Sequence, residues 1–182
     1  PDSNHVRGVF SIMSELRTNR IVPRDGLASG MSGGIIQMKQ TVVSVNTFNT
    51  TSTSKVDITG MSVSITPTRS DSKILISSHL SYGGNNFNFY CDLLRGSTRL
   101  FIPSSGNNPC TIALCGITNT TYQIFNSSFQ FLDEPATTSA VTYKLQIAVQ
   151  AGGGEFYLNR SKRNNSADSC CSSTITAMEV SG

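Results

Sequence analysis

The chain has 182 residues, a formal net charge of +3 and only 14% charged residues, so it is long enough for one domain and little more. This mild charge, without a dense basic patch among aromatic residues, argues against nucleic-acid binding. No run approaches the roughly 18 apolar residues of a membrane span, so we expect no membrane insertion. Serine, threonine and asparagine are abundant, and because their side chains compete with helical hydrogen bonds, they favour strands and turns.

Residues 1–34 are predicted to be an N-terminal arm and linker. Residues 1–12 differ in style from the rest, and Met13 begins a stretch that is typical of a natural start, so residues 1–12 are either native or additional upstream sequence. Residues 13–34 combine Pro23 with several glycines among small residues, which is a linker composition. They contain no heptad repeat, so we expect no coiled-coil stalk in this segment.

After the linker, apolar and polar residues alternate with a period of two, which is the pattern of half-buried strands. Turn signals such as Pro67, Gly96 and the glycines at 152–154 separate the strand candidates. The predicted strands cover residues 35–42, 61–66, 73–81, 87–95, 98–102, 122–132, 141–150, 155–159 and 173–180. No window of about 11 residues has a convincing helical stripe. We therefore predict one all-β domain over residues 35–182, an antiparallel β-sandwich of the jelly-roll type, with the 173–180 strand inside a sheet.

Residues that could carry catalysis or hold a metal are few and scattered. His79 stands alone in a predicted strand, where a histidine is usually structural. Cys110 and Cys115 are spaced C-x4-C, but no second pair or histidine lies nearby to complete a zinc site. A glycosidase needs two carboxylates roughly 5–9 Å apart, and a pairing of Asp92 with Glu155 would be a guess. We predict no catalytic residue, no cofactor-binding residue and no metal ligand, and we expect that the protein is not an enzyme.

Two long stretches of the sequence resemble a known group of proteins. The first runs from MSELRTNRIVPRDG through a glycine-rich bridge to GGIIQMKQTVVSVNTFNTTSTSKVDITGMSVSITPTRSDSKILI, and the second contains FYLNRS and SSTITAMEVSG. Both are similar to fibre-like and other structural proteins of marine bacteriophages, cyanophages especially. The resemblance spans residues 13–182. It implies a virion protein, assembled in the host cytoplasm, whose β-sandwich forms a homotrimer broadly like tumour-necrosis-factor or complement-head domains, and it implies no catalytic residues.

The family resemblance leaves two structural roles open. In the first, the chain is a short tail fibre, spike or tip that contributes to host attachment as a homotrimer. In the second, it is a capsid decoration or cement protein, which stabilises the shell. In both, we expect the N-terminal arm to bind other virion proteins. An enzyme such as a surface-polysaccharide depolymerase would usually need a longer chain and an acidic cleft, and neither is evident in the sequence.

Subunit contacts in such a trimer are expected from aromatic residues on exposed strand faces. Small polar residues on the strands leave each chain a modest core, so apolar burial between subunits would add stability. The candidate interface residues are Phe89, Tyr122, Phe125 and Tyr157, with Phe87 as a further exposed aromatic.

Host recognition is expected on loops at one end of the sandwich, because a rigid scaffold leaves its loops free to vary and bind. The candidate loops are residues 83–86, 103–119 and 160–172. The candidate receptor contacts within or beside them are Asn85, Asn86, Phe87, Arg160, Lys162 and Arg163. Arginine can bind the anionic groups of a surface glycan with two parallel hydrogen bonds, and asparagine can bind sugar hydroxyls. The alternative is that these charges only keep an exposed loop soluble.

Overall fold

The computed structural model describes residues 34–85, 87–116 and 121–181, and within these ranges there are eleven strands and no helix. The strands are β1 (Ile35–Val43), β2 (Asn49–Thr50), β3 (Val56–Ile65), β4 (Lys73–Asn85), β5 (Phe89–Arg95), β6 (Thr98–Leu100), β7 (Ile112–Leu114), β8 (Phe125–Asp133), β9 (Val141–Val149), β10 (Glu155–Leu158) and β11 (Ser173–Val180). The prediction of an all-β fold is confirmed. The predicted arm, apart from Gly34, lies outside the described residues.

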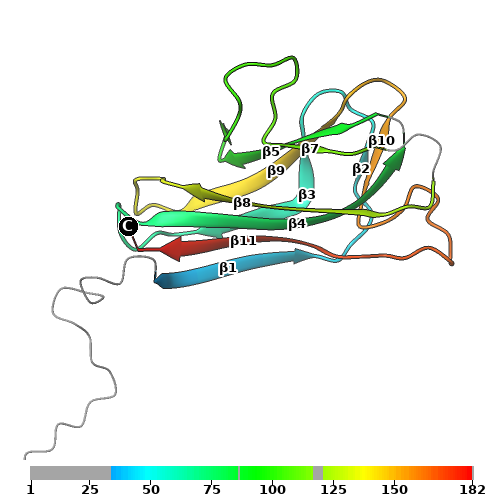
Figure 1. The fold of residues 1–182 in the computed structure, drawn as a ribbon. Helices are drawn as coiled ribbons and strands as arrows, with labels where there is room; N and C mark the ends of the chain where they lie inside the picture. The colour runs from blue at the N-terminus through cyan, green and yellow to red at the C-terminus, as the bar shows by residue number, and fades with distance from the viewer. Residues whose placement is uncertain (1–33, 86, 117–120, 182) are drawn as a thin grey trace, which may run out of the picture. The chain divides into compact units, whose positions relative to one another are not determined.

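The first sheet has four strand positions, two of which are each filled by a pair of collinear strands (Figure 1). β11 lies between β1 and β4, and β8 pairs with the other edge of β4. Tyr82 in β4 pairs with Phe125 of β8 and with Leu158 of β10, so β8 and β10 lie on opposite sides of β4. β10 therefore continues the line of β11. β2 pairs with the free edge of β10 and continues the line of β1.

The second sheet has the order β3, β9, β5 and then an outer position shared by β6 and β7. β9 pairs along one edge of β5, while β6 and β7 pair with successive parts of its other edge. When the strand positions are numbered along the chain, the order across the first sheet is one, eight, three, six. The order across the second sheet is two, seven, four, five. This is the order of a jelly roll, a sandwich built from two Greek keys. The predicted sandwich is confirmed, and β11 lies inside a sheet as predicted.

Some strand boundaries differ from the predicted ones. β2 and β7 were not predicted, because strands of two or three residues are too short to show alternation. β3 begins at Val56, before the predicted start at residue 61, because a bulge between Asp57 and Ser62 interrupts the alternation. Gly60 has a φ of 85° in this bulge, a conformation that glycine adopts without strain.

The core lies between the sheets and is built from the inward-facing residues of both. An aromatic group fills one end of it, where Tyr82 stacks on Phe156 with ring centroids 5.8 Å apart and Phe89 meets Phe156 edge-on at 5.3 Å. Such offset and edge-on geometries are the favourable ones for aromatic pairs. The largest fully buried side chains are Tyr143, Phe89, Phe156, Met61, Ile65, Ile74, Ile76, Leu80, Leu93, Leu114, Leu145 and Ile147.

Two of the aromatic residues expected at a subunit contact face this core. Phe89 is fully buried and shares the inward face of β5 with Cys91 and Leu93, so the prediction that it is an exposed interface residue is wrong. Phe125 is half-buried and packs on the core side against Tyr82, at 5.8 Å between ring centroids. Alternation places neighbouring residues on opposite faces of a strand, but it does not say which face is inside.

Glu179 at the end of β11 is a buried carboxylate that ties three segments together. Its Oε1 accepts hydrogen bonds at 2.7 Å from the backbone N–H and the hydroxyl of Thr68, and its Oε2 accepts one at 2.6 Å from the Gln37 amide. Burial alone would raise the pKa of Glu179, but the hydrogen bonds from Gln37 and Thr68 hold that pKa below its usual value. The ionised carboxylate therefore fastens β1 and the β3–β4 connection to β11.

The two ends of the sandwich differ in what they carry (Figure 1). At one end the Ser181 N–H donates to the Gly34 carbonyl at 3.2 Å, so the first and last described residues lie side by side. The β3–β4, β5–β6 and β8–β9 connections share this end, which we call the terminal end. The opposite end, called the loop end from here on, carries the β1–β3, β4–β5, β7–β8 and β9–β10 connections and lies next to the 160–172 loop.

Gly84 is predicted to be intolerant of any side chain. A Cβ atom there would lie 2.4 Å from the Phe89 ring and 2.5 Å from the Glu155 carbonyl oxygen, neither of which can move freely. We expect Gly84→Ala to destabilise the fold by about 2 kcal/mol, as overpacking of a core typically does. Urea unfolding followed by circular dichroism measures this change.

The matched control is Gly152→Ala, because no atom beyond the adjacent residues of the chain lies within 4 Å of the position its Cβ would take. It should change the free energy of unfolding by less than about 0.5 kcal/mol. Equal stability of the two variants would contradict the close packing around Gly84.

Candidate functional site

The structure brings two predicted arginines to the loop end, each over an aromatic ring. The guanidinium of Arg160 lies 4.2 Å from the centroid of the Tyr157 ring, and that of Arg163 lies 5.6 Å from the centroid of Tyr122. Cation–π contacts of this kind attract an arginine to the ring face. Tyr157 and Tyr122 were expected to contact another subunit, and within the chain they serve as platforms for these arginines.

Of the remaining receptor candidates, Lys162 lies in the 160–172 loop, Asn85 is the last residue of β4, and Phe87 lies between β4 and β5. Lys162 forms an ion pair with Glu155 at the start of β10. With its amide oriented to suit both neighbours, Asn85 donates to Glu155 at 2.9 Å and accepts from Lys162 at 2.8 Å. Phe87 is exposed and has a φ of 60° in the β4–β5 connection. Asn86 lies outside the described residues.

Most of the positive charge of the 160–172 loop is offset within the chain. Arg163 pairs with Asp168, and the hydrogen bonds from Arg163 hold the pKa of that carboxyl well below its usual range. Glu155 pairs with Lys162 in the same way. Two carboxylates thus stand against three cations, Arg160 included, which leaves a net charge of +1. The loop end is therefore more polar and aromatic than basic.

Asn159 makes the 160–172 loop possible, and the sequence analysis did not single it out. It is fully buried with a φ of 61°, a conformation that asparagine tolerates better than most residues. Its Nδ2 donates to the carbonyls of Val43 at 2.7 Å and Val45 at 2.9 Å, and its Oδ1 accepts from the Ser173 hydroxyl at 2.6 Å. The chain leaves the sheet at Asn159 and re-enters it at Ser173. An asparagine directly after a strand and before a long polar loop is the available sequence signal.

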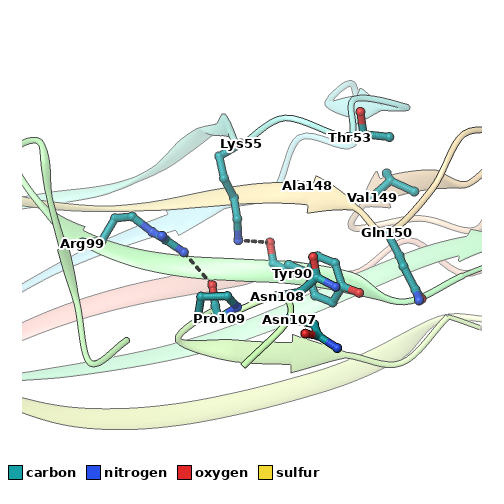
Figure 2. A pocket seen from close by; sticks show the side chains of 10 residues that line it. All are labelled: Thr53, Lys55, Tyr90, Arg99, Asn107, Asn108, Pro109, Ala148, Val149 and Gln150. Atoms are coloured by element: carbon teal, nitrogen blue, oxygen red, sulfur yellow. Dashed lines mark hydrogen bonds between the residues drawn. The ribbon is translucent and has the colours of Figure 1, made fainter. Parts of the chain in front are cut away.

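A second candidate site is a hollow of about 200 Å³ on the outer face of the second sheet (Figure 2). The strand segments that form it come from the ends of β5 and β9 that lie at the loop end, and the β6–β7 connection forms one wall. It is lined by Thr53, Lys55, Tyr90, Arg99, Asn107, Asn108, Pro109, Ala148, Val149 and Gln150.

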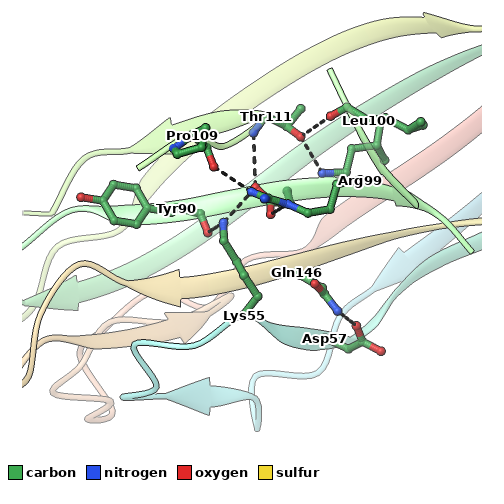
Figure 3. Close-up of polar contacts among 10 residues, drawn as sticks. Lys55, Asp57, Tyr90, Arg99, Leu100, Pro109, Thr111 and Gln146 are labelled. Carbon is green, nitrogen blue, oxygen red and sulfur yellow. Dashed lines mark hydrogen bonds and ion pairs between the residues drawn. The ribbon is translucent and has the colours of Figure 1, made fainter. Parts of the chain in front are cut away.

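Asp92 organises the charged side of this hollow (Figure 3). It lies on the face of β5 opposite that of Cys91 and Leu93, yet it is fully buried, and Figure 3 shows the side chains of its partners Lys55, Arg99 and Thr111. Its Oδ1 pairs with Lys55 Nζ at 2.8 Å, and its Oδ2 pairs with Arg99 Nε at 2.5 Å. The Thr111 N–H also donates to Oδ1 at 3.4 Å. One buried carboxylate therefore positions two cations whose side chains are partly exposed.

The β6–β7 connection is held over β5 by further hydrogen bonds. The hydroxyl of Thr111 donates to the Leu100 carbonyl at 2.8 Å and accepts from the Leu93 N–H at 2.9 Å. Arg99 Nη2 donates to the Pro109 carbonyl at 2.7 Å (Figure 2). These contacts fix the wall of the hollow, and they join residues that the sequence pattern did not link.

The carboxylates considered for a glycosidase pair are not brought together. Asp92 lies on the second sheet in ion pairs with Lys55 and Arg99, while Glu155 lies on the first sheet and pairs with Lys162. His79 is on the outer face of the first sheet, where its ring nitrogens lie 3.0 Å from the Ser128 hydroxyl and 3.3 Å from that of Ser81.

The described residues contain no group of three or more His, Cys, Asp or Glu side chains that could hold a metal ion. Within the same ranges, no helix is long and apolar enough to cross a membrane. Comparison with protein-family models and with curated proteins found no match for the chain.

Replacing Asp92 by Asn is predicted to destabilise the fold by about 2 kcal/mol. The change leaves Lys55 and Arg99 without their anionic partner, and the loss is smaller than for a fully buried pair because both cations are partly exposed. The change is measured as a shift in the urea unfolding midpoint.

Asp57→Asn is the matched control on the same sheet face. Asp57 also bonds a lysine, Lys144 at 2.8 Å, but it is exposed, and an exposed ion pair contributes well under about 1 kcal/mol. If Asp92→Asn shifted the midpoint no more than Asp57→Asn, Asp92 would not be the organising residue.

Proposed function

We propose that this chain is a structural protein of a bacteriophage virion, a short tail fibre or spike that works as a homotrimer and contributes to host attachment. The observation that carries the proposal is the polarity of the sandwich. Gly34 and Ser181, the first and last described residues, lie together at the terminal end, while the β4–β5 connection, the 160–172 loop and the hollow lie toward the loop end. A domain anchored through its arm would present the loop end outward. The resemblance of the sequence to marine phage fibre proteins supports the same role.

The outer face of the first sheet supports the homotrimer. The strand register aligns Met38, Met178, Leu75 and Leu132 in one row across β1, β11, β4 and β8. Met38 is 59% exposed and Leu132 46% exposed. Ile35 and Val42 are also exposed near the two ends of β1, and Gln40 separates Val42 from Met38 on the same face. An antiparallel sheet with one solvated face normally carries polar residues there, so an apolar row suits contact with further copies of the chain.

We therefore propose this apolar row as the subunit contact, in place of the aromatic residues expected from the sequence. Light scattering at micromolar concentration should give three times the chain mass of 19.5 kDa. The double variant Met38→Asp with Leu132→Asp should give monomers of unchanged circular dichroism, because burying two carboxylates between subunits is costly. Ser62→Asp, an exposed residue on the second sheet, is the control and should leave the trimer intact. A wild-type protein that scatters as a clean monomer would overturn the homotrimer.

Attachment through the loop end predicts that the purified protein competes with phage for adsorption to host cells. The variant Lys162→Ser with Arg163→Ser should compete at least threefold less well, and the loss should be larger at low salt. Arg69→Ser is the control, because Arg69 is also an exposed arginine paired with an aspartate, Asp71, but lies in the β3–β4 connection at the terminal end.

Unchanged competition by folded trimers of the loop-end variant, at low and high salt, would remove this loop from the attachment surface. If the wild-type protein did not compete at all, and virions lacking it lost shell stability instead, host attachment would be wrong and a capsid decoration role would take its place.

A further inference from the structure

We propose that the hollow on the outer face of the second sheet binds a carboxylated monosaccharide unit, such as a uronic acid within a surface glycan. This inference names a ligand class for the proposed attachment function and rests on that function for its biological meaning. The hollow was not among the recognition loops predicted for residues 83–86 and 160–172, although its wall belongs to the predicted 103–119 loop.

The position of the hollow suits a ligand presented to the loop end. Tyr90 is the second residue of β5, and Gln150 directly follows β9, so both lie where those strands meet the loop end. Thr53 comes from the connection that precedes β3 at the same end. Figure 2 shows the side chains of Lys55, Tyr90 and Gln150 around the hollow.

The charge of the hollow favours an anion. Lys55 is 24% exposed and Arg99 40% exposed, whereas the single carboxylate that they share, Asp92, is fully buried. Two cations against one carboxylate leave a net positive charge on the accessible side. Arg99 uses Nε for Asp92 and Nη2 for the Pro109 carbonyl, and its Nη1 makes no hydrogen bond to any described residue. Nη1 is thus a fixed donor for the carboxylate of a ligand.

The neutral groups of the hollow suit hydroxyls. Across the described parts of the chain, no hydrogen bond engages the side-chain amides of Asn107 and Asn108 or the hydroxyl of Tyr90. Gln150 Oε1 accepts from the Asn88 N–H at 3.1 Å, which leaves Nε2 as a donor. Amides both donate and accept, as sugar hydroxyls do, and the Tyr90 ring offers an apolar wall.

The size of the hollow selects a small ligand. Its volume of about 200 Å³ is below the range of roughly 300–1,000 Å³ that is usual for pockets of drug-sized molecules. A single sugar ring with a carboxylate combines the small size, the negative charge and the hydroxyls that the lining would bind. Inorganic phosphate shares only the negative charge with this ligand. The difference in affinity between glucuronic acid and phosphate therefore measures what the neutral groups contribute.

The test is to titrate the full chain separately with glucuronic acid, glucose and inorganic phosphate. Nuclear magnetic resonance or calorimetry measures the binding. Glucuronic acid should bind with a Kd at least fivefold lower than that of glucose or phosphate, and added salt should weaken it. Asn108→Ala and Tyr90→Phe should each raise the Kd about 2- to 10-fold, the value of one lost hydrogen bond. Neither change removes a contact that holds the fold. Gln130→Ala on the first sheet is the control and should leave the Kd unchanged.

Equal binding of glucose and glucuronic acid would overturn the role of the cations, and equal binding of phosphate would overturn the role of the amides and Tyr90. Absence of saturable binding, or a Kd unchanged in both variants, would overturn the site itself. If sugar binding failed in one of these ways but the protein still competed with phage for adsorption, only the hollow would be excluded as the ligand site. If glucuronic acid bound as expected but the protein did not compete for adsorption, the sugar site would stand and the attachment function would fail.

Discussion

The pairing of β4 along both edges is the constraint on which the rest of the sandwich depends. β8 bonds one edge, and β10 and β11 together bond the other, so the 13 residues of β4 lie inside the first sheet. The inward side of β4 supplies large core residues up to Tyr82 and then Gly84, whereas Gly83 lies on the outer side. Without side chains at these two positions, the backbone of residues 160–161 and the Phe89 ring can approach closely. The loop end is therefore packed by backbone and rings from other strands.

Three strand positions are interrupted by loops, and a small polar residue makes the two longest interruptions possible. Asn159 satisfies the backbone where the chain leaves the first sheet for residues 160–172. Thr111 bonds the backbone on both sides where the β6–β7 connection returns to the second sheet. Buried backbone groups near a break need partners, because an unpaired buried polar group is costly. Both loops can then vary in their exposed parts without loosening the sheets.

The two surfaces toward the loop end differ in how their charges are satisfied. In the 160–172 loop, Lys162 and Arg163 each have a carboxylate partner within the chain. In the hollow, Lys55 and Arg99 share the single buried carboxylate of Asp92, and no described residue accepts a hydrogen bond from Arg99 Nη1. Excess positive charge beside a buried anchor is a preorganised arrangement, whereas paired surface charges must first be separated. This difference is the reason to place an anionic ligand in the hollow.

The sequence by itself determined the fold class, because a period of two combined with turn residues such as Pro67 and Gly96 is compatible only with strands and tight connections. It also placed the 160–172 loop correctly between the last two strands. Only the tertiary structure decided that Phe89 faces the core and its neighbour Tyr90 faces the hollow, since alternation is the same for either face. The Asp92 ion pairs likewise depend on register, because Lys55 lies 37 residues away in the chain and reaches Asp92 only when β3, β9 and β5 pair side by side. Contacts between distant strands are set by packing and register, which no local pattern contains.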